Sequence, residues 1–362
     1  MIHAVSSVQM PAHRPAWHLR WPVLLLLAAM VLLLPLAVAR GAPAGPALSG
    51  ADAAQLHALK RAGDAVVALN VTVTEGATSA ETLGLRRSGS GVVIGSDGLI
   101  LTIGYLLLEA DTIEVVMQDA RVLPARLVAY DLATGFGLVR PLVPLRGIEP
   151  VPFGALAGVK QGEPLMVATG SEQGTEVAFT RLVGTRPFSG YWEYHIESAA
   201  FTSPPVANHT GASLFNRNGE LLGIGSLLVL ESAGPDRLLP GNMFVPTDLL
   251  RPVLAEMQAT GRTRASIRPW LGLSSSEREG HVQIVRVDRA GPALAAGLHS
   301  GDVVLEIDGV KVKTLEGFYK QLWKRTTPDA DVELTVRQGA ATRKITVHAV
   351  DRMTTLRKPE GI

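Results

Sequence analysis

Short apolar runs separated by turn residues dominate the chain from residue 64 to about residue 245. Runs such as AVVALNVTV, SGVVIG, TIEVVM and ELLGIGSLLVL lie between Gly, Pro, Asp and Asn. Short runs bounded by such residues are typical of β-strands rather than of helices. The pattern therefore predicts an all-β barrel or sandwich for this part of the chain.

Two stretches on either side of this region show helical spacing instead. Residues 51–62 carry apolar positions at helical intervals, and Gly63 suits the C-terminal end of that helix. Thr247 is placed to cap a second helix over 248–260, and Gly261 is placed to close it. We expect the β-rich region to be bordered by these two helices.

A second β-rich unit is expected over residues 269–351, with one helix of its own over 314–325. The segment TLEGFYKQLWKR has apolar residues at helical intervals. This spacing puts one set of side chains on a single helix face. The set is Leu315, Phe318, Tyr319 and Leu322.

The N-terminal sequence predicts export. Three basic residues precede an apolar run over 21–39, which ends in the small-residue pattern Ala37-Val38-Ala39. This order is typical of a cleaved signal peptide. The run is also close to the length that spans a bilayer, so an uncleaved inner-membrane anchor stays open. Both alternatives place the rest of the chain outside the cytoplasm, in the periplasm or otherwise exported.

Composition shifts divide the chain further. The segments RGAPAGPALSG and GRTRASIR have the small, polar and proline-rich composition of linkers. The predicted division is a signal peptide or anchor over 1–39, a linker over 40–50, a barrel domain over 51–260, a linker over 261–268, a second domain over 269–351 and a tail over 352–362.

Charge and cysteine content exclude several classes of function. The 362 residues have a formal net charge of +1 and contain no cysteine. A near-neutral chain has no strong field to recruit nucleic acid. Disulfides, thiolate nucleophiles and cysteine-ligated metals are excluded. We expect no nucleic-acid partner and no cofactor, and a membrane partner only if residues 21–39 stay uncleaved.

Several segments resemble the HtrA/DegP family, in the order that this family has them. They are Ser88–Ile94, Ser96–Thr102, Asp131–Thr134, Asn218–Ile224 and Met243–Thr247. The resemblance covers roughly residues 52–350. It implies a mainly β protein, with a trypsin-like double β-barrel followed by a PDZ domain that is β-rich and has one or two helices.

The second unit carries its own resemblance to the PDZ domain of that family. The glycine-containing segments Ala290–Ala293, Ala296–Leu298, Gly301–Val304 and Ile307–Gly309 follow the PDZ pattern. PDZ domains add an extended peptide as a strand and bind its terminal carboxylate with backbone N–H groups. The resemblance implies a carboxylate-binding loop and a far groove wall: Trp270, Leu271, Gly272 and Leu273 for the loop; Leu315, Phe318, Tyr319 and Leu322 for the wall. A domain that only packs against the barrel is the alternative.

The catalytic positions of this family carry other residues here. The stretch Asn208–Asn216 stands where the nucleophile motif lies, with Thr210 in the serine position. The same resemblance puts Tyr105 in the histidine position and Gly135 in the aspartate position. Proteolysis needs a hydroxyl, an imidazole and a carboxylate acting together. A phenol is a poor base at neutral pH, and glycine has no side chain. We therefore predict a degenerate triad.

The loop around the nucleophile position is altered as well. The segment Thr202–Pro205 is the expected insertion relative to the family, and Asn208 and Ala212 replace glycines of the motif. The backbone N–H groups of an oxyanion hole depend on this loop. Two histidines, His195 and His209, stay open as replacement bases for Thr210.

The sequence thus predicts a non-catalytic HtrA-like pseudoprotease. It would bind C-terminal or unfolded exported polypeptides as a chaperone, adaptor or assembly factor. One alternative is a serine-type endopeptidase with an unusual Thr210-based site. A second is a metal-handling scaffold built from His195 and His209 with Glu193, Glu197 or Tyr105. The resemblance also implies assembly, either as a homotrimer or with an active relative.

Overall fold

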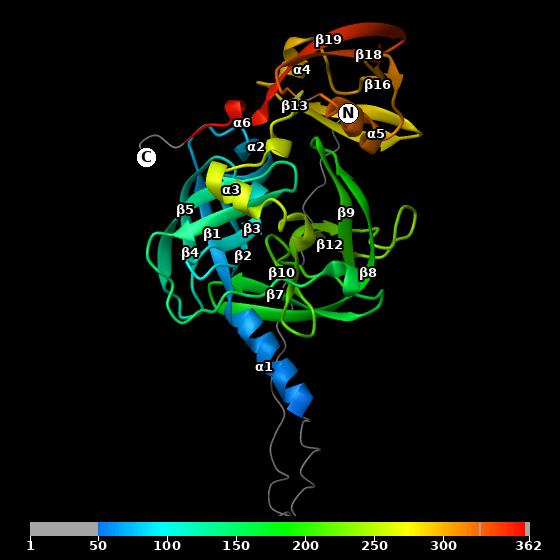
Figure 1. Ribbon diagram of the computed structural model, residues 1–362. Coiled ribbons are helices and arrows are strands. Elements are labelled where there is room, and N and C mark those ends of the chain that lie inside the picture. The colour runs from blue at the N-terminus through cyan, green and yellow to red at the C-terminus, as the bar shows by residue number, and fades with distance from the viewer. Residues whose placement is uncertain (1–49, 326, 359–362) are drawn as a thin grey trace, which may run out of the picture. The chain divides into compact units, whose positions relative to one another are not determined.

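The computed structural model describes residues 50–325 and 327–358. Within them, strands form two closed barrels and one further sheet (Figure 1). The expected mainly β fold, with a trypsin-like double barrel and a PDZ domain, is confirmed.

The first barrel is antiparallel and closes in the strand order β1-β2-β3-β6-β5-β4. Most buried apolar side chains of its strands are Val, Leu or Ile, so the barrel interior is filled by side chains. Its strands are β1 (Val66–Val73), β2 (Arg86–Val93), β3 (Ile100–Ile103), β4 (Ala110–Val116), β5 (Val122–Tyr130) and β6 (Phe136–Pro141).

The second barrel closes in the order β10-β11-β12-β9-β8-β7. Its longest hairpin joins β8 to β9, and the turn of this hairpin is Tyr191–Glu193. Its strands are β7 (Pro164–Ser171), β8 (Gly174–Gly190), β9 (Tyr194–Ser203), β10 (Ser213–Phe215), β11 (Leu221–Val229) and β12 (Gly241–Pro246).

The third sheet has the order β13-β19-β18-β16-β15-β14, with β17 paired to β16. Its own apolar core includes Leu271, Phe318 and Val336, separate from the cores of the barrels. Its strands are β13 (Pro269–Trp270), β14 (Leu273–Arg278), β15 (His281–Val287), β16 (Val303–Ile307), β17 (Val310–Lys311), β18 (Ala330–Gln338) and β19 (Ala341–Asp351).

Among the described residues, the 15-residue α1 precedes β1 and α6 follows β19, and the other helices are short and lie between strands. The α-helices are α1 (Gly50–Asp64), α2 (Ala80–Leu83), α3 (Leu254–Thr260), α4 (Pro292–Ala295), α5 (Leu315–Leu322) and α6 (Arg352–Thr355). The 3-10 helices are η1 (Gly104–Leu107), η2 (Leu156–Gly158), η3 (Thr247–Leu249) and η4 (Arg264–Ser266). Thr314 caps α5 as an N-cap should, since its hydroxyl accepts the N–H of Gly317 at 3.0 Å.

Two helix boundaries differ from the sequence prediction. Helix α1 runs through Gly63, since the N–H of Ala65 still bonds to the Arg61 carbonyl. The predicted 248–260 helix is broken, and α3 begins only at Leu254. Its expected cap, Thr247, instead gives its hydroxyl proton to the buried carbonyl of Leu221 at 3.0 Å. Thr247 is thus held by the sheet, and a short 3-10 turn takes the place of the first helical turns.

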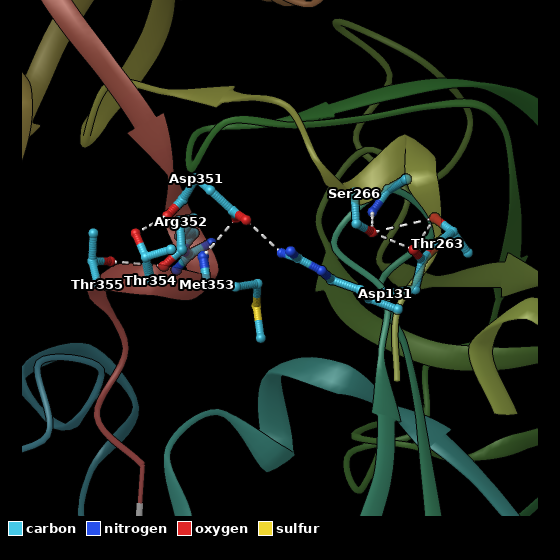
Figure 2. A network of polar contacts seen from close by, with 10 residues as sticks. Asp131, Thr263, Ser266, Asp351, Arg352, Met353, Thr354 and Thr355 are labelled. Atoms are coloured by element: carbon cyan, nitrogen blue, oxygen red, sulfur yellow. Dashed lines mark hydrogen bonds and ion pairs between the residues drawn. The ribbon is translucent and has the colours of Figure 1, made fainter. Parts of the chain in front are cut away.

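The segment 261–268, expected to be a plain linker, is anchored by buried hydrogen bonds. Figure 2 shows Asp131 beside Thr263 and Ser266, whose hydroxyls both donate to its carboxylate. Arg262 pairs with Asp351 at the end of β19 at 2.5 Å. Because these side chains are largely removed from water, the segment is part of the folded structure rather than a loose tether.

The predicted signal peptide or anchor over 1–39 lies outside the described residues. Among the helices at residues 50–358 that the structure describes, none combines the length and apolar character needed to cross a bilayer.

Candidate functional site

Two of the three predicted triad positions lie side by side. Tyr105 is held by η1, directly after β3, and Thr210 lies in the loop between β9 and β10. Their hydroxyl oxygens are 3.1 Å apart. The Tyr105 hydroxyl is also 2.9 Å from the carbonyl oxygen of Ser226. The sequence separation of 105 residues is therefore closed by the two barrels meeting at this point.

The hydrogen bonds of Tyr105 leave Thr210 without a usable base. A carbonyl only accepts, so the single phenol proton goes to Ser226 and the Thr210 hydroxyl donates to the phenol oxygen. Burial raises the pKa of Tyr105 above its ordinary value of 10.0, against a smaller opposing effect of the Thr210 bond. A neutral phenol oxygen does not remove a proton from an alcohol at neutral pH.

Gly135, the third predicted position, faces another residue. It lies between β5 and β6 with φ +84°, a conformation that favours glycine. A Cβ there would lie 3.0 Å from the hydroxyl oxygen of Tyr194. That hydroxyl donates to the carbonyl of Thr134 at 2.6 Å. The space beside Gly135 is thus taken by a tyrosine from β9.

The nearby carboxylate of Asp131 is already fully bonded. Thr263 and Ser266 donate to one oxygen, and the N–H and hydroxyl of Thr134 donate to the other at 2.9 and 2.6 Å. The side chain is buried. Asp131 therefore holds segment 261–268 in place and has no free oxygen for orienting a base.

Among the described residues, the hydrogen bonds of the two candidate replacement bases go to residues other than Thr210. Nδ1 of His195 lies 2.9 Å from the Ser189 hydroxyl, and its other nitrogen faces Glu197 at 3.5 Å. Nδ1 of His209 is 2.9 Å from the carbonyl of Ala207, so this nitrogen carries the proton. The structure places the two imidazoles in separate surroundings.

The predicted metal-ligand set is not brought together as a whole. Within residues 50–325 and 327–358, the atoms of His195 and Glu197 cluster instead with Glu316, all within 4.8 Å of one another. The ammonium of Lys320 lies 2.9 Å from Glu197 and 2.6 Å from Glu316. Because this ammonium pairs with both carboxylates, the cluster is an ion-pair network.

The loop around Thr210 borders an open cleft of about 350 Å³ between the barrels. The carbonyl of Thr210 accepts the N–H of Ser90 at 2.9 Å, and Gly211 follows with φ +71°. Asn70, Asn208 and Gly170 line the same cleft. Of the expected insertion 202–205, the first two residues belong to the end of β9. The cleft thus has room for an extended segment.

The predicted carboxylate-binding loop already holds a carboxylate. Trp270 ends β13, Leu273 begins β14, and Leu271 and Gly272 form the turn between them. The side chain of Glu193, from the β8–β9 turn, accepts the N–H of Leu273 at 2.8 Å and that of Leu271 at 3.1 Å.

The predicted wall residues of α5 face mostly inward. The side chains of Leu315, Phe318 and Leu322 are buried in the core of the third sheet. Tyr319 also contributes to that core, and its hydroxyl reaches the β8–β9 turn, 2.8 Å from the carbonyl oxygen of Gly190.

Two important residues were missed by sequence reasoning. Glu193 was considered only as a metal ligand, and Tyr194 was not considered at all. The one local signal is the aromatic run Tyr191-Trp192-Glu193-Tyr194 at a hairpin turn, where turn-forming Gly, Asn or Asp would be expected.

Two domain families match the chain. The PDZ domain model matches residues 269–349, and the trypsin-like peptidase domain model matches residues 89–224. The second match spans all three positions of the predicted triad.

Curated relatives share both regions. A probable periplasmic serine endoprotease, DegP-like, from Halomonas elongata is 30% identical over 284 residues, which cover 74% of this chain and 57% of the relative. The serine endoprotease DegS of Haemophilus influenzae is 28% identical over 273 residues, which cover 70% of this chain and 74% of that protein. The chain is an HtrA/DegP-like family protein.

This HtrA/DegP-like chain also shares its fold with solved structures. Two structures of the HtrA-type protease AlgW, one with tripeptide and one with decapeptide, align with TM-scores of 0.52 and 0.51. The sequence identities are 23% and 22%, and each alignment covers 84% of this chain. The chain spans about half the length of the DegP-like relatives that it matches, 57% and 47% in two cases.

Proposed function

We propose that this HtrA/DegP-like protein does not cleave peptide bonds and binds exported polypeptides instead. It would act as a chaperone, adaptor or assembly factor, with the PDZ groove and the cleft between the barrels as its two binding surfaces. Tyr105, Gly135 and Thr210 are, on this proposal, the remnants of a catalytic triad.

One observation carries the proposal. The Thr210 hydroxyl, which stands in the nucleophile position, is hydrogen-bonded to a phenol rather than to an imidazole. Nucleophilic catalysis by a hydroxyl needs a base within hydrogen-bond reach to take its proton. The phenol that is in reach has its own proton committed to Ser226 and a pKa raised by burial. Thr210 is therefore an inactive alcohol.

A protease assay on unfolded casein tests this. Purified protein and a Thr210→Ala variant are incubated beside an active HtrA-type enzyme. We expect no turnover from either protein under conditions where the control enzyme digests the casein. Turnover that disappears in Thr210→Ala would show that Thr210 is a working nucleophile and would overturn the proposal.

Binding is the positive half of the proposal. The cleft of about 350 Å³ is bordered by polar side chains and backbone from both barrels, and the PDZ loop presents N–H groups that hold a carboxylate. Isothermal titration with unfolded casein measures client binding without any cleavage. Absence of a heat signal, in the natural chain and in a variant whose PDZ groove is freed, would remove the binding function.

Location and assembly belong to the same proposal. The DegP-like relative is named as a probable periplasmic endoprotease, and the basic-apolar N-terminus argues for export of this chain. Assembly as a homotrimer or with an active relative is tested by light scattering of the protein, alone and mixed with that relative.

A further inference from the structure

The groove between β14 and α5 is filled by part of the same chain. The turn of the β8–β9 hairpin, Tyr191–Glu193, lies in it and makes the contacts that a PDZ domain uses for a peptide C-terminus. The Glu193 side chain is buried, with 6% of the residue exposed. A buried carboxylate is stable only where its charge or its proton finds hydrogen-bond partners.

The partners of Glu193 are backbone donors of the carboxylate-binding loop. Oε1 accepts from Leu273 at 2.8 Å and from Leu271 at 3.2 Å, and Oε2 accepts from Leu271 at 3.1 Å. Gly272 adds a third backbone N–H that acts on the same carboxylate. Successive N–H groups of a turn form a concave anion site. The backbone N–H donors of the loop are therefore occupied by a carboxyl group of the same chain.

The backbone beside Glu193 continues this contact as a strand. The N–H of Ser275 in β14 donates to the carbonyl of Tyr191 at 2.8 Å. Tyr191 precedes Glu193 by two residues, and Ser275 follows Leu273 by two residues. The two segments thus run antiparallel with matching two-residue steps, as when a peptide adds a strand to a sheet edge.

Helix α5 holds the turn from the other side. The hydroxyl of Tyr319 donates to the carbonyl of Gly190 at 2.8 Å and accepts the N–H of Glu193 at 3.1 Å. Both walls of the groove, β14 and α5, therefore contact the hairpin turn.

The conformation of the turn favours this arrangement. Glu193 has φ +50°, which is uncommon for a residue with a side chain and marks a position held by its surroundings. The neighbouring Trp192 stacks on Tyr194 with ring centroids 5.7 Å apart. Tyr194 is fixed in turn by its bond to Thr134. The barrel therefore presents a rigid turn rather than a loose loop.

We propose that the β8–β9 turn is an internal ligand of the PDZ groove, with the Glu193 carboxyl in the place of a peptide C-terminus. The groove is closed until a chain with a free terminal carboxylate displaces the turn. This inference rests on the proposed peptide-binding function and names how that site is regulated.

The displacement links the two binding surfaces of the protein. A ligand that enters the groove accepts the N–H groups of Leu271 and Leu273 in place of Glu193, and the turn is released. Tyr194, the next residue, lies against Gly135 in the predicted aspartate position. Occupation of the PDZ groove would thus act, through Glu193 and Tyr194, on the predicted aspartate position.

Glu193→Ala in the full chain tests the proposal by two readouts. The first is hydrogen exchange of the Leu271 and Leu273 amides. The second is fluorescence anisotropy with a labelled decapeptide pool, randomised at its last four positions with a free C-terminus, and with the same pool amidated. The control Glu333→Ala removes a carboxylate from an exposed ion pair on β18 of the same domain.

We expect Glu193→Ala to speed exchange of both amides and to tighten binding of the free-carboxylate pool at least 10-fold over wild type. The amidated pool should stay unbound, and Glu333→Ala should behave as wild type. Unchanged amide exchange, or a wild type that binds as tightly as Glu193→Ala, overturns the proposal. If the Leu271 and Leu273 amides exchange faster in Glu193→Ala but neither this variant nor the wild type binds the peptide pool, the internal contact of Glu193 is upheld. The proposed peptide-binding function is then the part that is wrong.

Tyr319→Phe is a second variant, which keeps the test valid if Glu193→Ala does not fold. It removes the two hydrogen bonds of the Tyr319 hydroxyl, to Gly190 and Glu193, and keeps the aromatic ring in the core. We expect a smaller gain in pool binding, about 3-fold. A peptide-pool affinity equal to that of wild type would contradict the role of Tyr319 in holding the β8–β9 turn in the groove.

Discussion

On the function proposed above, the cleft between the barrels and the groove of the PDZ domain are kept out of use in opposite ways. The cleft is open, with room of about 350 Å³, and the Thr210 hydroxyl beside it is bonded to a phenol in place of an imidazole. The groove keeps its binding groups, and these are occupied by Glu193. On this proposal, one surface is silent because Thr210 has a phenol beside it in place of an imidazole, and the other is closed because another part of the chain fills it.

The difference teaches that the groove is easier to return to use than the cleft. The β8–β9 turn competes with other ligands for the groove. A peptide, or a single substitution in the turn, can therefore shift the balance between the docked and the released turn by the difference in its free energy of interaction with the two states. Positions near the cleft are also packed against or bonded to other residues. Tyr194 fills the space beside Gly135, and segment 261–268 uses the carboxylate of Asp131.

The largest expected effect tests this asymmetry directly. A Tyr105→His, Gly135→Asp, Thr210→Ser revertant should remain at least about 10⁴-fold below an active HtrA-type enzyme, since triad members act only as a unit. The reason is that Gly135 has φ +84° and its Cβ would lie 3.0 Å from the Tyr194 hydroxyl, so the new carboxylate is misplaced. Casein turnover measures it. Recovery of near-normal turnover would show that three side chains alone silence the cleft.

The next effect is on the stability of the cleft loop. Gly211→Ala should lower the free energy of unfolding by about 3 kcal/mol, because the new Cβ combines a strained φ with overpacking. Gly211 has φ +71°, and its Cβ would be 2.0 Å from the Ser90 carbonyl oxygen. Urea denaturation measures the change. The control is Gly184→Ala, where nothing lies within 4 Å, and an equal loss there would refute the argument.

A smaller effect is the pH dependence of the groove. Burial raises the pKa of Glu193 from 4.5 to about 7, against the loop N–H groups and Arg352, which lower it. Tyr319 and Arg268 are the other titratable groups that act on this site. The docked state therefore holds the proton more tightly than the released state. Docking is fully supported below the ordinary pKa, and this support is lost as pH rises through about 7.

Affinity for the free-carboxylate peptide pool should thus rise about 10-fold or more between pH 5 and pH 8, since each pKa unit is worth a factor of ten. Anisotropy titrations at intermediate pH values measure it. Glu193→Gln, which keeps the shape and cannot ionise, should remove the dependence. An equal pH dependence in Glu193→Gln would assign it to another group.

The smallest effect concerns the phenol in the cleft. Tyr105→Phe should lower the free energy of unfolding by about 1 kcal/mol, since the Ser226 carbonyl loses its donor. Thermal denaturation measures it, and Tyr191→Phe serves as the control, because that residue is 54% exposed. If Tyr105→Phe leaves the free energy of unfolding unchanged, the Tyr105 hydroxyl is not needed as a hydrogen-bond donor to the Ser226 carbonyl.

Much of the fold and part of the site followed from local patterns. Strand alternation, turn glycines and the PDZ segments predicted the double barrel and the PDZ domain, because each pattern reports on burial within its own element. The helix over 248–260 was predicted too long, because the long-range bond of Thr247 to Leu221 overrode its capping propensity. The occupied groove was not predicted, because Glu193 and Leu271 are 78 positions apart.

The sequence by itself determined the architecture and the chemistry that is missing. A chain with Tyr105, Gly135 and Thr210 at these positions has no imidazole–carboxylate pair there, whatever its packing. Only the tertiary structure decided what the remaining groups do. Whether Glu193 is solvated or bound to a PDZ loop, and whether Asp131 is free or saturated, depends on which distant backbone donors and hydroxyls the fold brings within 3 Å. Hydrogen bonds act over that short range, and composition and spacing along the chain do not report on it.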